Sequence, residues 1–447
     1  MKTRTLVYTL LNRWTKGKGY PEALLQTVFA RYPSLSRLDK AFITELFYGT
    51  IRWLNQLDYI IDTFTRTNPQ KIDLKVRNLL RLGIYQILHL DKVPDGIAVY
   101  ETVEVAKEKR FPSWIIRFIN ALLRALVRQK EAISFPKDDP VRFIALKYAH
   151  PEWLVKRWLK EFGEEATIGL CAFNNTPPPV IIRTNTLKIT RAALKKKLEE
   201  TGTEVEETKF SPEGLWLKRL SCSLYELPGF KSGLFLPQAE VSQIISHLLT
   251  PRPDEIILDA CAGIGGKTTH LAQLMHNQGQ IFAVEPNKRR LKRLQKHIKK
   301  MDITIVYPRL GRIEEIISAF PKSYFDRVLV DAPCSGLGVL RQNVDLKWQR
   351  QEEEIEALAS LQIFLLNTVA PYVKKGGVLL YATCTLTKEE NQEVIKQFLD
   401  THPEFILEDL RQRFPQYATF CTKEGYFGSL PFKHQLEGFF AARLRRI

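Results

Sequence analysis

Hydrophobic side chains change their spacing along the chain, and each spacing predicts a different kind of element. In residues 42–53, 76–88 and 98–106, apolar positions recur every three or four residues, which is the period of one face of an α-helix. Alternating apolar and polar runs and β-branched clusters are scarce before residue 130. The first third of the chain is therefore predicted to be all-helical.

The pattern becomes mixed after a polar, proline-containing stretch at 129–140, which predicts a linker. A strand is predicted over Val180–Asn185, and a basic helix over Arg191–Leu198. Further strands are predicted near Leu215 and Leu234. This mixture predicts a small α+β module.

From about residue 240, short apolar strand-like runs alternate with helical ones. Such alternation predicts a parallel sheet that is covered on both faces by helices. Two runs near the C-terminus, 426–430 and 438–444, predict an antiparallel hairpin at the edge of that sheet. The predicted strands are Ile256–Asp259, Ile281–Glu285, Ile303–Val306, Val328–Asp331 and Val378–Tyr381, and the predicted helices are Lys267–Met275, Lys288–Lys300 and Ala357–Val369.

Together these patterns predict a multidomain protein. The predicted domains are an α-helical domain over 1–135, a small α+β module over 141–235 and a C-terminal α/β Rossmann-like domain over 236–447. A chain of 447 residues is long for a single core, and 45% hydrophobic with 26% charged residues is typical of a globular protein.

The chain is strongly basic, with 66 Lys and Arg against 49 Asp and Glu and a net charge of +17. Such a charge attracts polyanions, and RNA, DNA and acidic membrane surfaces are the candidates. Residues 1–140 hold 23 Lys and Arg against 14 Asp and Glu, about half of the excess. Any one of these side chains is more often simply solvated, but their sum predicts an anchoring surface for nucleic acid.

The cysteines are too far apart for the paired spacing of zinc ribbons or thioredoxin-like sites, so we expect no metal centre. Scattered cysteines in a large basic chain indicate reduced thiols and a cytoplasmic location. The N-terminal apolar stretch is too short for a signal peptide, and no apolar run approaches the length that spans a bilayer. The cysteines are Cys171, Cys222, Cys261, Cys334, Cys384 and Cys421.

A glycine-rich loop, Ala260–Lys267, follows a predicted strand and precedes a predicted helix. Glycines let the backbone approach a ligand closely, and the helix start offers free N–H groups, although such turns also serve packing alone. Glu285 ends the next strand, where an acid either accepts the hydroxyls of a ribose or pairs with Lys288 or Arg289. Loop and acid fit a nucleoside cofactor, either S-adenosyl-L-methionine or NAD.

Two cysteines favour the first of these cofactors. Cys334 and Cys384 each follow a predicted strand, and a 3-2-1-4-5 strand order makes those strands neighbours beside the glycine loop. A lone cysteine is usually a small buried hydrophobe, but two at the ligand-binding edge indicate chemistry. Hydride transfer needs no thiol there. Methylation of cytosine carbon 5 does, because that carbon reacts only after a nucleophile adds to carbon 6.

The segments around these cysteines, 331–341 and 381–391, resemble the paired motifs of the RNA cytosine-C5 methyltransferase family. The resemblance extends over essentially the whole chain, which is similar throughout to the bacterial members that act on 16S ribosomal RNA. Residues 42–124 resemble their NusB-like helical domain, and 150–154 and 183–187 resemble their middle RNA-contacting module. The C-terminal domain is then expected to be a class I S-adenosyl-L-methionine-dependent methyltransferase.

The resemblance also implies roles for individual residues. Cys384 would be the nucleophile, Cys334 would assist release of the product, and Asp331 would hold the cytosine edge. The expected partner is 16S ribosomal RNA, with no membrane and no metal, and a monomer is expected. The residues implied for S-adenosyl-L-methionine are Cys261, Ala262, Gly263, Ile264, Gly265, Gly266, Lys267, Glu285 (on the ribose) and Asp331.

The sequence departs from the family pattern in four places. Gly263-Ile264 stands where Ala-Pro is usual, and Leu310 stands where an aspartate commonly contacts adenine. Residues 342–346 replace a typical Arg-His-Pro-Asp pattern, and Glu437 replaces an aspartate. Two other functions therefore stay open: a non-catalytic RNA-binding factor for ribosome assembly or antitermination, and a cytosine-C5 methyltransferase that acts on transfer RNA.

Overall fold

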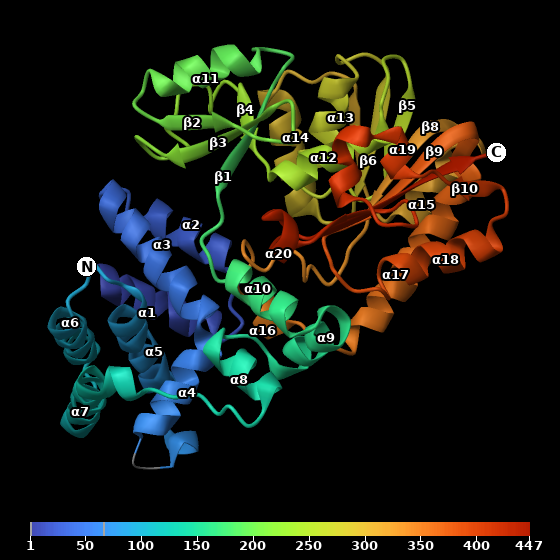
Figure 1. Ribbon diagram of the computed structural model, residues 1–447. Coiled ribbons are helices and arrows are strands. Elements are labelled where there is room, and N and C mark those ends of the chain that lie inside the picture. The colour runs from blue at the N-terminus through green and yellow to red at the C-terminus, as the bar shows by residue number, and fades with distance from the viewer. Residues whose placement is uncertain (1, 66–67) are drawn as a thin grey trace. The chain divides into compact units, whose positions relative to one another are not determined.

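The computed structural model describes residues 2–65 and 68–447, which fold into two compact units (Figure 1). Unit 1 comprises Met1–Thr176 together with the short segment Asn343–Gln349. Unit 2 comprises Pro177–Gln342 and Arg350–Ile447.

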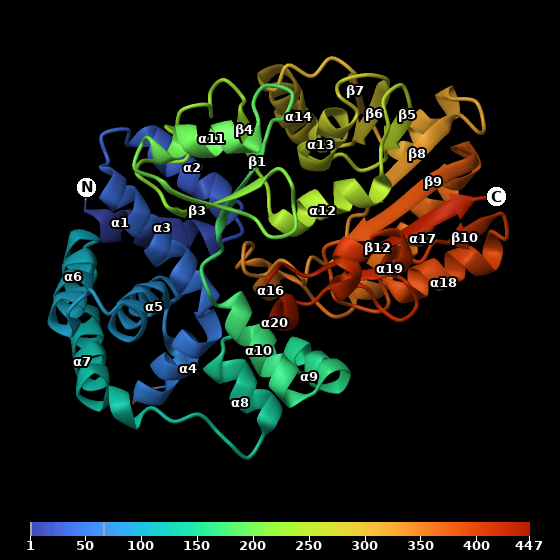
Figure 2. The same ribbon diagram turned by 45° about the horizontal axis from the view of Figure 1, so that its top comes forward.

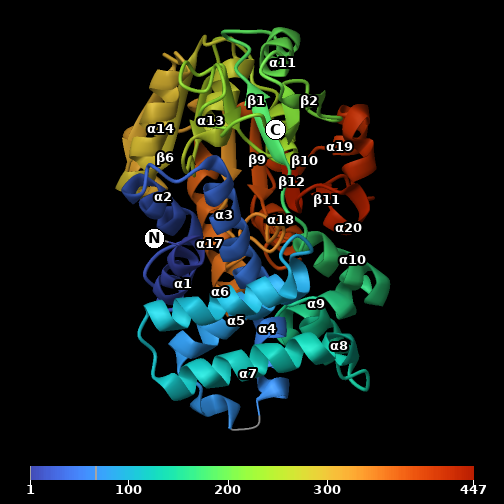
Figure 3. The same ribbon diagram turned by 90° about the vertical axis from the view of Figure 1, so that its left-hand side faces the viewer.

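Unit 1 is helical, as predicted. Helix α5 lies at its centre and contacts α1, α3, α4, α6 and α7 (Figures 1 and 3). Leu79, Leu80, Leu82 and Ile84 of α5 are all fully buried, because this helix is apolar around most of its circumference. The helices are α1 (Thr3–Trp14), α2 (Pro21–Arg31), α3 (Arg37–Arg52), α4 (Leu54–Phe64), α5 (Leu74–His89), α6 (Asp95–Glu108), α7 (Ser113–Gln129), α8 (Pro140–Lys147), α9 (Glu152–Phe162), α10 (Glu164–Asn174) and α16 (Leu346–Gln349).

Residues 141–176 belong to unit 1, although the sequence assigned them to the middle module. Side-chain amides of α4 hold them there, since Asn55 donates to the carbonyls of Ala145 and His150 and Gln56 donates to that of Lys147. These hydrogen bonds join residues about 90 positions apart, so the local sequence pattern did not indicate the unit against which residues 141–176 pack. The domain limits remain a prediction, and they differ from the two units in the placement of residues 141–176. The predicted limits are 1–135, 141–235 and 236–447.

Segment 343–349 packs into unit 1 although the segments that flank it belong to unit 2. Val344 is buried in the core of unit 1, and the Trp348 indole N–H donates to the carbonyl of Ile51 at 2.7 Å. The chain therefore leaves unit 2 after Gln342 and returns to it at Arg350.

Unit 2 contains a small antiparallel sheet in the order β2-β3-β1-β4, with helix α11 (Arg191–Glu199) packed on it. Strand β1 (Val180–Thr184), β3 (Gly214–Arg219) and β4 (Phe235–Pro237) were predicted. Strand β2 (Glu204–Glu207) was not, because Val205 is its one apolar residue.

The large sheet of unit 2 has the order β10-β12-β9-β8-β5-β6-β7. Strands β5 to β9 are parallel and follow the predicted 3-2-1-4-5 order, and β12 and β10 extend the sheet antiparallel beside β9. Strand β11 pairs with β12, which confirms the predicted hairpin. The strands are β5 (Ile256–Asp259), β6 (Gln280–Glu285), β7 (Val306–Leu310), β8 (Phe325–Asp331), β9 (Val373–Thr383), β10 (Phe405–Leu407), β11 (Phe427–Ser429) and β12 (Phe439–Arg446).

Helices cover both faces of this sheet, as predicted (Figure 2). Neighbouring strand residues face opposite sides, so Ile257 joins one core and Leu258 joins the other. One face carries α12 (Glu240–Leu249), α13 (Gly266–Leu274) and α14 (Lys288–Lys300), and the other carries α15 (Ile313–Ile316), α17 (Glu354–Val369) and α18 (Gln392–Thr401).

Strand β7 lies C-terminal to its predicted position, at Val306–Leu310 instead of Ile303–Val306. Pro308 argued against a strand, because proline cannot donate a ladder hydrogen bond. The strand tolerates it because β7 is the edge of the sheet.

Residues Glu354–Tyr372 form a helix that is long and apolar enough to cross a membrane by length and composition alone. The expectation that no run approaches that length was therefore wrong. In the fold, however, Leu365, Leu366 and Val369 of this helix pack on the sheet. Gln362 also donates to the carbonyl of Pro333 at 3.0 Å, so one face of the segment packs against the rest of unit 2.

Candidate active site

The predicted site residues meet at one edge of the large sheet. Because β5 to β9 are parallel, their carboxyl ends lie at that edge, where sheets of this kind bind ligands. The terminal residues of these strands are Asp259, Glu285, Leu310, Asp331 and Thr383.

The glycine loop after β5 needs two of its glycines for different reasons. Gly263 has φ +57°, and a Cβ there would meet nothing within 4 Å, so its backbone faces open space. Gly265 has φ +86°, and a Cβ there would lie 2.2 Å from Leu294. Gly265 thus permits packing on α14, whereas Gly263 leaves backbone accessible to a ligand.

Lys267, in the first turn of α13, contacts Asp331 at the end of β8. Its Nζ lies 2.7 Å from Oδ2 of Asp331 and 5.2 Å from the centre of the Phe439 ring. The ion pair is partly buried, with 10% of the Lys267 side chain and 30% of the Asp331 side chain exposed. Lys267 therefore joins the glycine loop to the end of β8.

Asp259 is buried beneath the loop. Its Oδ2 accepts a hydrogen bond from Thr268 at 2.6 Å, while Oδ1 has no partner within the described chain. Burial raises the pKa of Asp259 to about 7, despite the opposing bond from Thr268. Near neutral pH this carboxyl is therefore close to its titration point.

We expect Asp259 to make the protein less stable as the pH rises from about 4 to 7. In that interval the folded state holds a proton that the unfolded state has released, so stability is full below about pH 4 and falls until the folded pKa of about 7 is passed. In the wild type this loss should amount to about 2–3 kcal/mol of the free energy of unfolding between pH 5 and 7, at about 1.4 kcal/mol per pH unit. Asp259→Asn should abolish it, because asparagine does not titrate. Urea unfolding at several pH values measures it. Asp400→Asn, at an exposed position, is the control, and equal profiles for wild type and Asp259→Asn would contradict the expectation.

Glu285 is 4% exposed at the end of β6, and its Oε1 accepts from the backbone N–H of Asn287 at 2.7 Å. Asn287 in turn caps α14 through its own side chain. Within the described residues Glu285 makes no ion pair with Lys288 or Arg289, which was the alternative to a ribose-binding role.

The two cysteines lie side by side. Cys334 Sγ is 3.4 Å from Cys384 Sγ, and the backbone N–H of Cys384 donates to Cys334 Sγ at 3.4 Å. Both thiols are free. The hydrogen bond with the Cys384 sulfur, together with burial, holds the pKa of the Cys334 thiol well above its usual value. The Cys334 thiol is therefore held in its protonated form.

Glu390 connects the two cysteine loops, a role that sequence reasoning missed. It is fully buried, and its Oε1 accepts from the Ser335 backbone N–H at 2.7 Å. Its Oε2 accepts from the hydroxyls of Ser335 at 2.5 Å and Thr387 at 2.7 Å. An acid so close after Cys384 in a polar run was the available signal, but only the fold shows that it clamps the neighbours of both cysteines.

Arg350 supports the Cys334 loop from the other side. Its Nε donates to the Ser335 carbonyl at 3.0 Å, and an Nη donates to the Cys334 carbonyl at 3.4 Å. Arg350 is the first residue after segment 343–349, so the loop is held at the point where the chain re-enters unit 2.

Comparison with known proteins decides the family. The model of 16S rRNA methyltransferase RsmB/F matches residues 246–445, the NusB family model matches 1–128, and the RsmF/B-like ferredoxin-like domain model matches 150–223. A probable ribosomal RNA small subunit methyltransferase B of Bacillus subtilis is 35% identical over 99% of this chain and 98% of its own. The chain belongs to the RsmB/F methyltransferase family. The ribosomal RNA small subunit methyltransferase B of Pseudomonas putida is 34% identical over 84% of each chain.

Solved structures agree with this assignment. The crystal structure of PH0851 covers 100% of this RsmB/F methyltransferase with a TM-score of 0.82 and 27% identity, and 99% of its own chain is matched. A methyltransferase homolog protein from Pyrococcus horikoshii covers 68% of this chain and 98% of its own, with a TM-score of 0.60 and 29% identity. The predicted fold class, with a NusB-like helical part, a small α+β module and a Rossmann-like methyltransferase domain, is confirmed, as is the predicted kinship.

Proposed function

We propose that this RsmB/F methyltransferase methylates carbon 5 of a cytosine in 16S ribosomal RNA, with S-adenosyl-L-methionine as donor and a covalent bond between Cys384 and cytosine carbon 6. The observation that carries the proposal is the 3.4 Å separation of the Cys334 and Cys384 sulfurs at the sheet edge that also bears the glycine loop. Thiols in this position suit addition to a pyrimidine ring and serve no purpose in methylation of an exocyclic nitrogen or a hydroxyl.

The assignment of Cys384 as nucleophile rests on the resemblance of segment 381–391 to the second cysteine motif of the family. The raised pKa of Cys334 keeps that thiol protonated, so it can act as a hydrogen-bond donor toward its neighbour. Cys384 directly follows β9, the longest strand of the sheet, and Ala382 of β9 pairs with Asp331 of β8. This register brings Cys384 next to the acid that would hold the base.

The residues around the glycine loop fit S-adenosyl-L-methionine. Gly263 leaves the loop backbone accessible, Glu285 retains a carboxylate oxygen for the ribose hydroxyls, and the orphaned Oδ1 of buried Asp259 lies beneath the loop. When bound, S-adenosyl-L-methionine supplies an electrophilic methyl group. Lys267 and Asp331 would then line the boundary between cofactor and base.

In the proposed reaction the Cys384 sulfur forms a bond to carbon 6, and the electron pair of the 5,6 double bond makes carbon 5 nucleophilic. Asp331, whose Oδ2 is already held by Lys267, keeps its second oxygen for the cytosine edge. After methylation carbon 5 releases its proton to water, the C–H electron pair re-forms the 5,6 double bond, and the bond between carbon 6 and the Cys384 sulfur breaks so that Cys384 leaves as a thiolate. Cys334, at 3.4 Å, assists this release. The target base must leave its stack to reach the edge.

Bisulfite sequencing of ribosomal and transfer RNA tests the proposal, in cells with and without this gene. One protected cytosine in 16S ribosomal RNA should become convertible when the gene is absent. Loss of a transfer RNA signal instead would favour the alternative substrate. If no signal changes and calorimetry detects no binding of S-adenosyl-L-methionine, the non-catalytic assembly role remains.

Leu310 offers a test of the cofactor site. It ends β7 directly beside Glu285 and is 48% exposed, at the position where the family commonly has an adenine-contacting aspartate. Leu310→Asp should tighten S-adenosyl-L-methionine binding about fivefold to tenfold, since a hydrogen bond to the adenine amino group contributes about 1 kcal/mol. Calorimetry measures the affinity, and Leu310→Val, which adds no acceptor, should leave it unchanged. Weaker binding by Leu310→Asp would indicate that the adenine does not bind next to residue 310.

Unit 1 carries a hollow suited to RNA phosphates. Its volume is about 530 Å³, and none of its described lining residues is acidic. Tyr8 and Phe111 add aromatic surface. We propose that this hollow, here called the basic hollow, is the anchoring surface predicted from the charge of the N-terminal third. Its basic residues are Arg13, Lys16, Lys18, Lys75, Lys109 and Arg110.

A further inference from the structure

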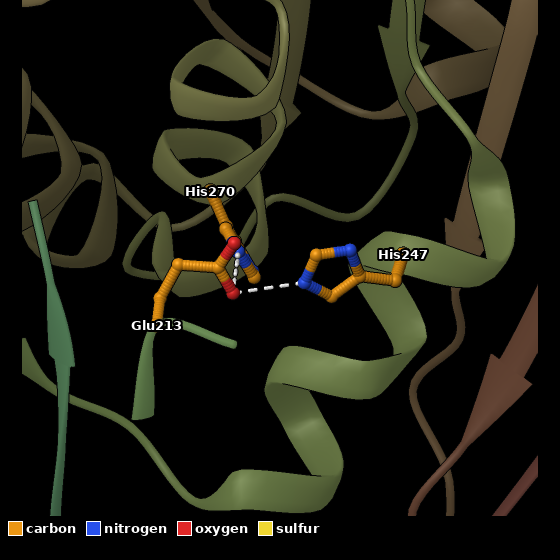
Figure 4. Close-up of side chains that lie close together, drawn as sticks. All are labelled: Glu213, His247 and His270. Atoms are coloured by element: carbon orange, nitrogen blue, oxygen red, sulfur yellow. Dashed lines mark hydrogen bonds and ion pairs between the residues drawn. The ribbon is translucent and has the colours of Figure 1, made fainter. Parts of the chain in front are cut away.

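Glu213, His247 and His270 converge within unit 2, away from the two cysteines in the sequence (Figure 4). Oε2 of Glu213 is 2.8 Å from Nε2 of His247 and 3.5 Å from Nε2 of His270. The three ligand atoms lie within 4.8 Å of one another. Glu213 immediately precedes β3 of the small sheet, whereas the histidines belong to α12 and α13 beside the large sheet.

His270 is an unsatisfied group. It is fully buried, and neither of its ring nitrogens has a hydrogen-bond partner within the described chain. A buried polar group without a partner costs about 1–3 kcal/mol, so such groups usually mark an undescribed ligand, water or ion. Burial lowers the pKa of His270 to about 3, with Arg183 acting in the same direction. The imidazole is thus neutral and offers a lone pair.

Glu213 supplies the negative charge of the cluster. Burial would favour its neutral form, but the hydrogen bond with His247 and the nearby His270 imidazole outweigh this and lower the pKa of Glu213 below its usual value. Within the described residues, its ion pairs are with these two imidazoles alone. Arg183, a cation that interacts electrostatically with Glu213 and His270, directs its guanidinium to Gln238, to the Gly266 carbonyl and to Thr269.

We propose that Glu213, His247 and His270 bind a divalent first-row transition metal ion, with Zn²⁺ as the best match. Two imidazole nitrogens and one carboxylate oxygen are a common zinc ligand set, which leaves a fourth position for water. Ligand atoms at about 2.0–2.2 Å from Zn²⁺ lie about 3.4 Å apart in a tetrahedron, so the two Glu–His separations of 2.8 and 3.5 Å need only small adjustments. His247 would carry its proton on Nδ1 when Nε2 binds the ion.

Such an ion would have a structural effect. It would join the small sheet, through Glu213, to α12 and α13, and α13 begins at the glycine loop of the proposed cofactor site. The 20% exposure of the His247 side chain gives the ion a route from solvent. Arg183 nearby disfavours a cation, so we expect weaker binding than in a zinc finger. Cysteine spacing predicted no metal centre, but these donors are a glutamate and two histidines, separated by 34 and 23 residues.

Metal titration of the full-length protein, prepared without a histidine tag and stripped with a chelator, tests the proposal. Calorimetry with Zn²⁺ should find one site, and Co²⁺ should give the intense visible absorption of tetrahedral coordination. His247→Gln, at the most exposed ligand, should weaken Zn²⁺ binding more than tenfold. His402→Gln is the matched control, because His402 lies 3.0 Å from Glu404 in a His–Glu pair that is not part of the triad.

A second measurement guards against misfolded variants. Zn²⁺ should raise the melting temperature of the wild type and of His402→Gln, but not that of Glu213→Gln, which keeps the size of the side chain and removes its charge. Circular dichroism verifies that each variant is folded. No Zn²⁺ site in the wild type, or equal affinity in wild type and His247→Gln, would leave only a hydrogen-bonded Glu–His cluster and overturn the proposal.

Discussion

Replacing Cys384 by alanine is expected to abolish methylation, by at least about a thousandfold, the scale on which enzymes lose activity when their nucleophile is removed. Without the sulfur, carbon 6 has no partner and carbon 5 stays unreactive. Incorporation of a tritiated methyl group into 16S ribosomal RNA measures the loss. No RNA adduct should form in this variant.

Cys334→Ala is expected to behave differently. Cys384 can still add to the base, but release is impaired, so enzyme and RNA should accumulate as an adduct that survives denaturing electrophoresis. The 3.4 Å sulfur–sulfur contact makes this a sensitive comparison, because each variant leaves one thiol at almost the same place.

Cys222→Ala, on a cysteine of the small-sheet region, controls for the loss of a thiol as such. It should retain activity and give no adduct. If Cys384→Ala accumulates the adduct and Cys334→Ala does not, the two roles are reversed. If neither variant affects methylation, the covalent mechanism is wrong even though the family assignment stands.

Reversing three charges of the basic hollow should weaken RNA binding about a hundredfold at low salt. The triple variant Arg13→Glu, Lys16→Glu and Lys75→Glu removes exposed cations from two helices and the segment after α1. Each lost phosphate contact should also reduce the slope of log affinity against log salt by about one. Fluorescence anisotropy with a 16S ribosomal RNA fragment at several salt concentrations measures both quantities.

The matched control is Lys137→Glu, Arg142→Glu and Lys156→Glu, which changes net charge equally on other exposed positions of unit 1. Charge reversal is a better test than deletion of residues 1–130, because α8 to α10 and segment 343–349 pack with those helices. Equal losses in both triple variants would show that only overall charge matters. Unchanged binding in the first variant would remove the anchoring role of the basic hollow.

Local patterns determined much of this protein. Amphipathic spacing in 76–88 predicted α5, and the alternation of strands and helices after residue 240 predicted the parallel order that puts Cys334 and Cys384 at one edge. These predictions succeeded because burial on a helix face or within a two-sided sheet leaves a periodic mark on the sequence itself. The same periodic runs showed where each strand ends, and the glycine loop and the cysteines that follow those ends marked the candidate site.

Other features depended on contacts between distant residues, which leave no periodic mark. Polar pairing between Asn55 and the carbonyl of Ala145 assigns α8 to unit 1, and the clamp by Glu390 depends on the hydroxyls that two loops present to it. The convergence of Glu213 with His270 is of this kind too. Sequence spacing sets the face on which a side chain lies, but only the packing of whole elements decides which buried donor meets which acceptor.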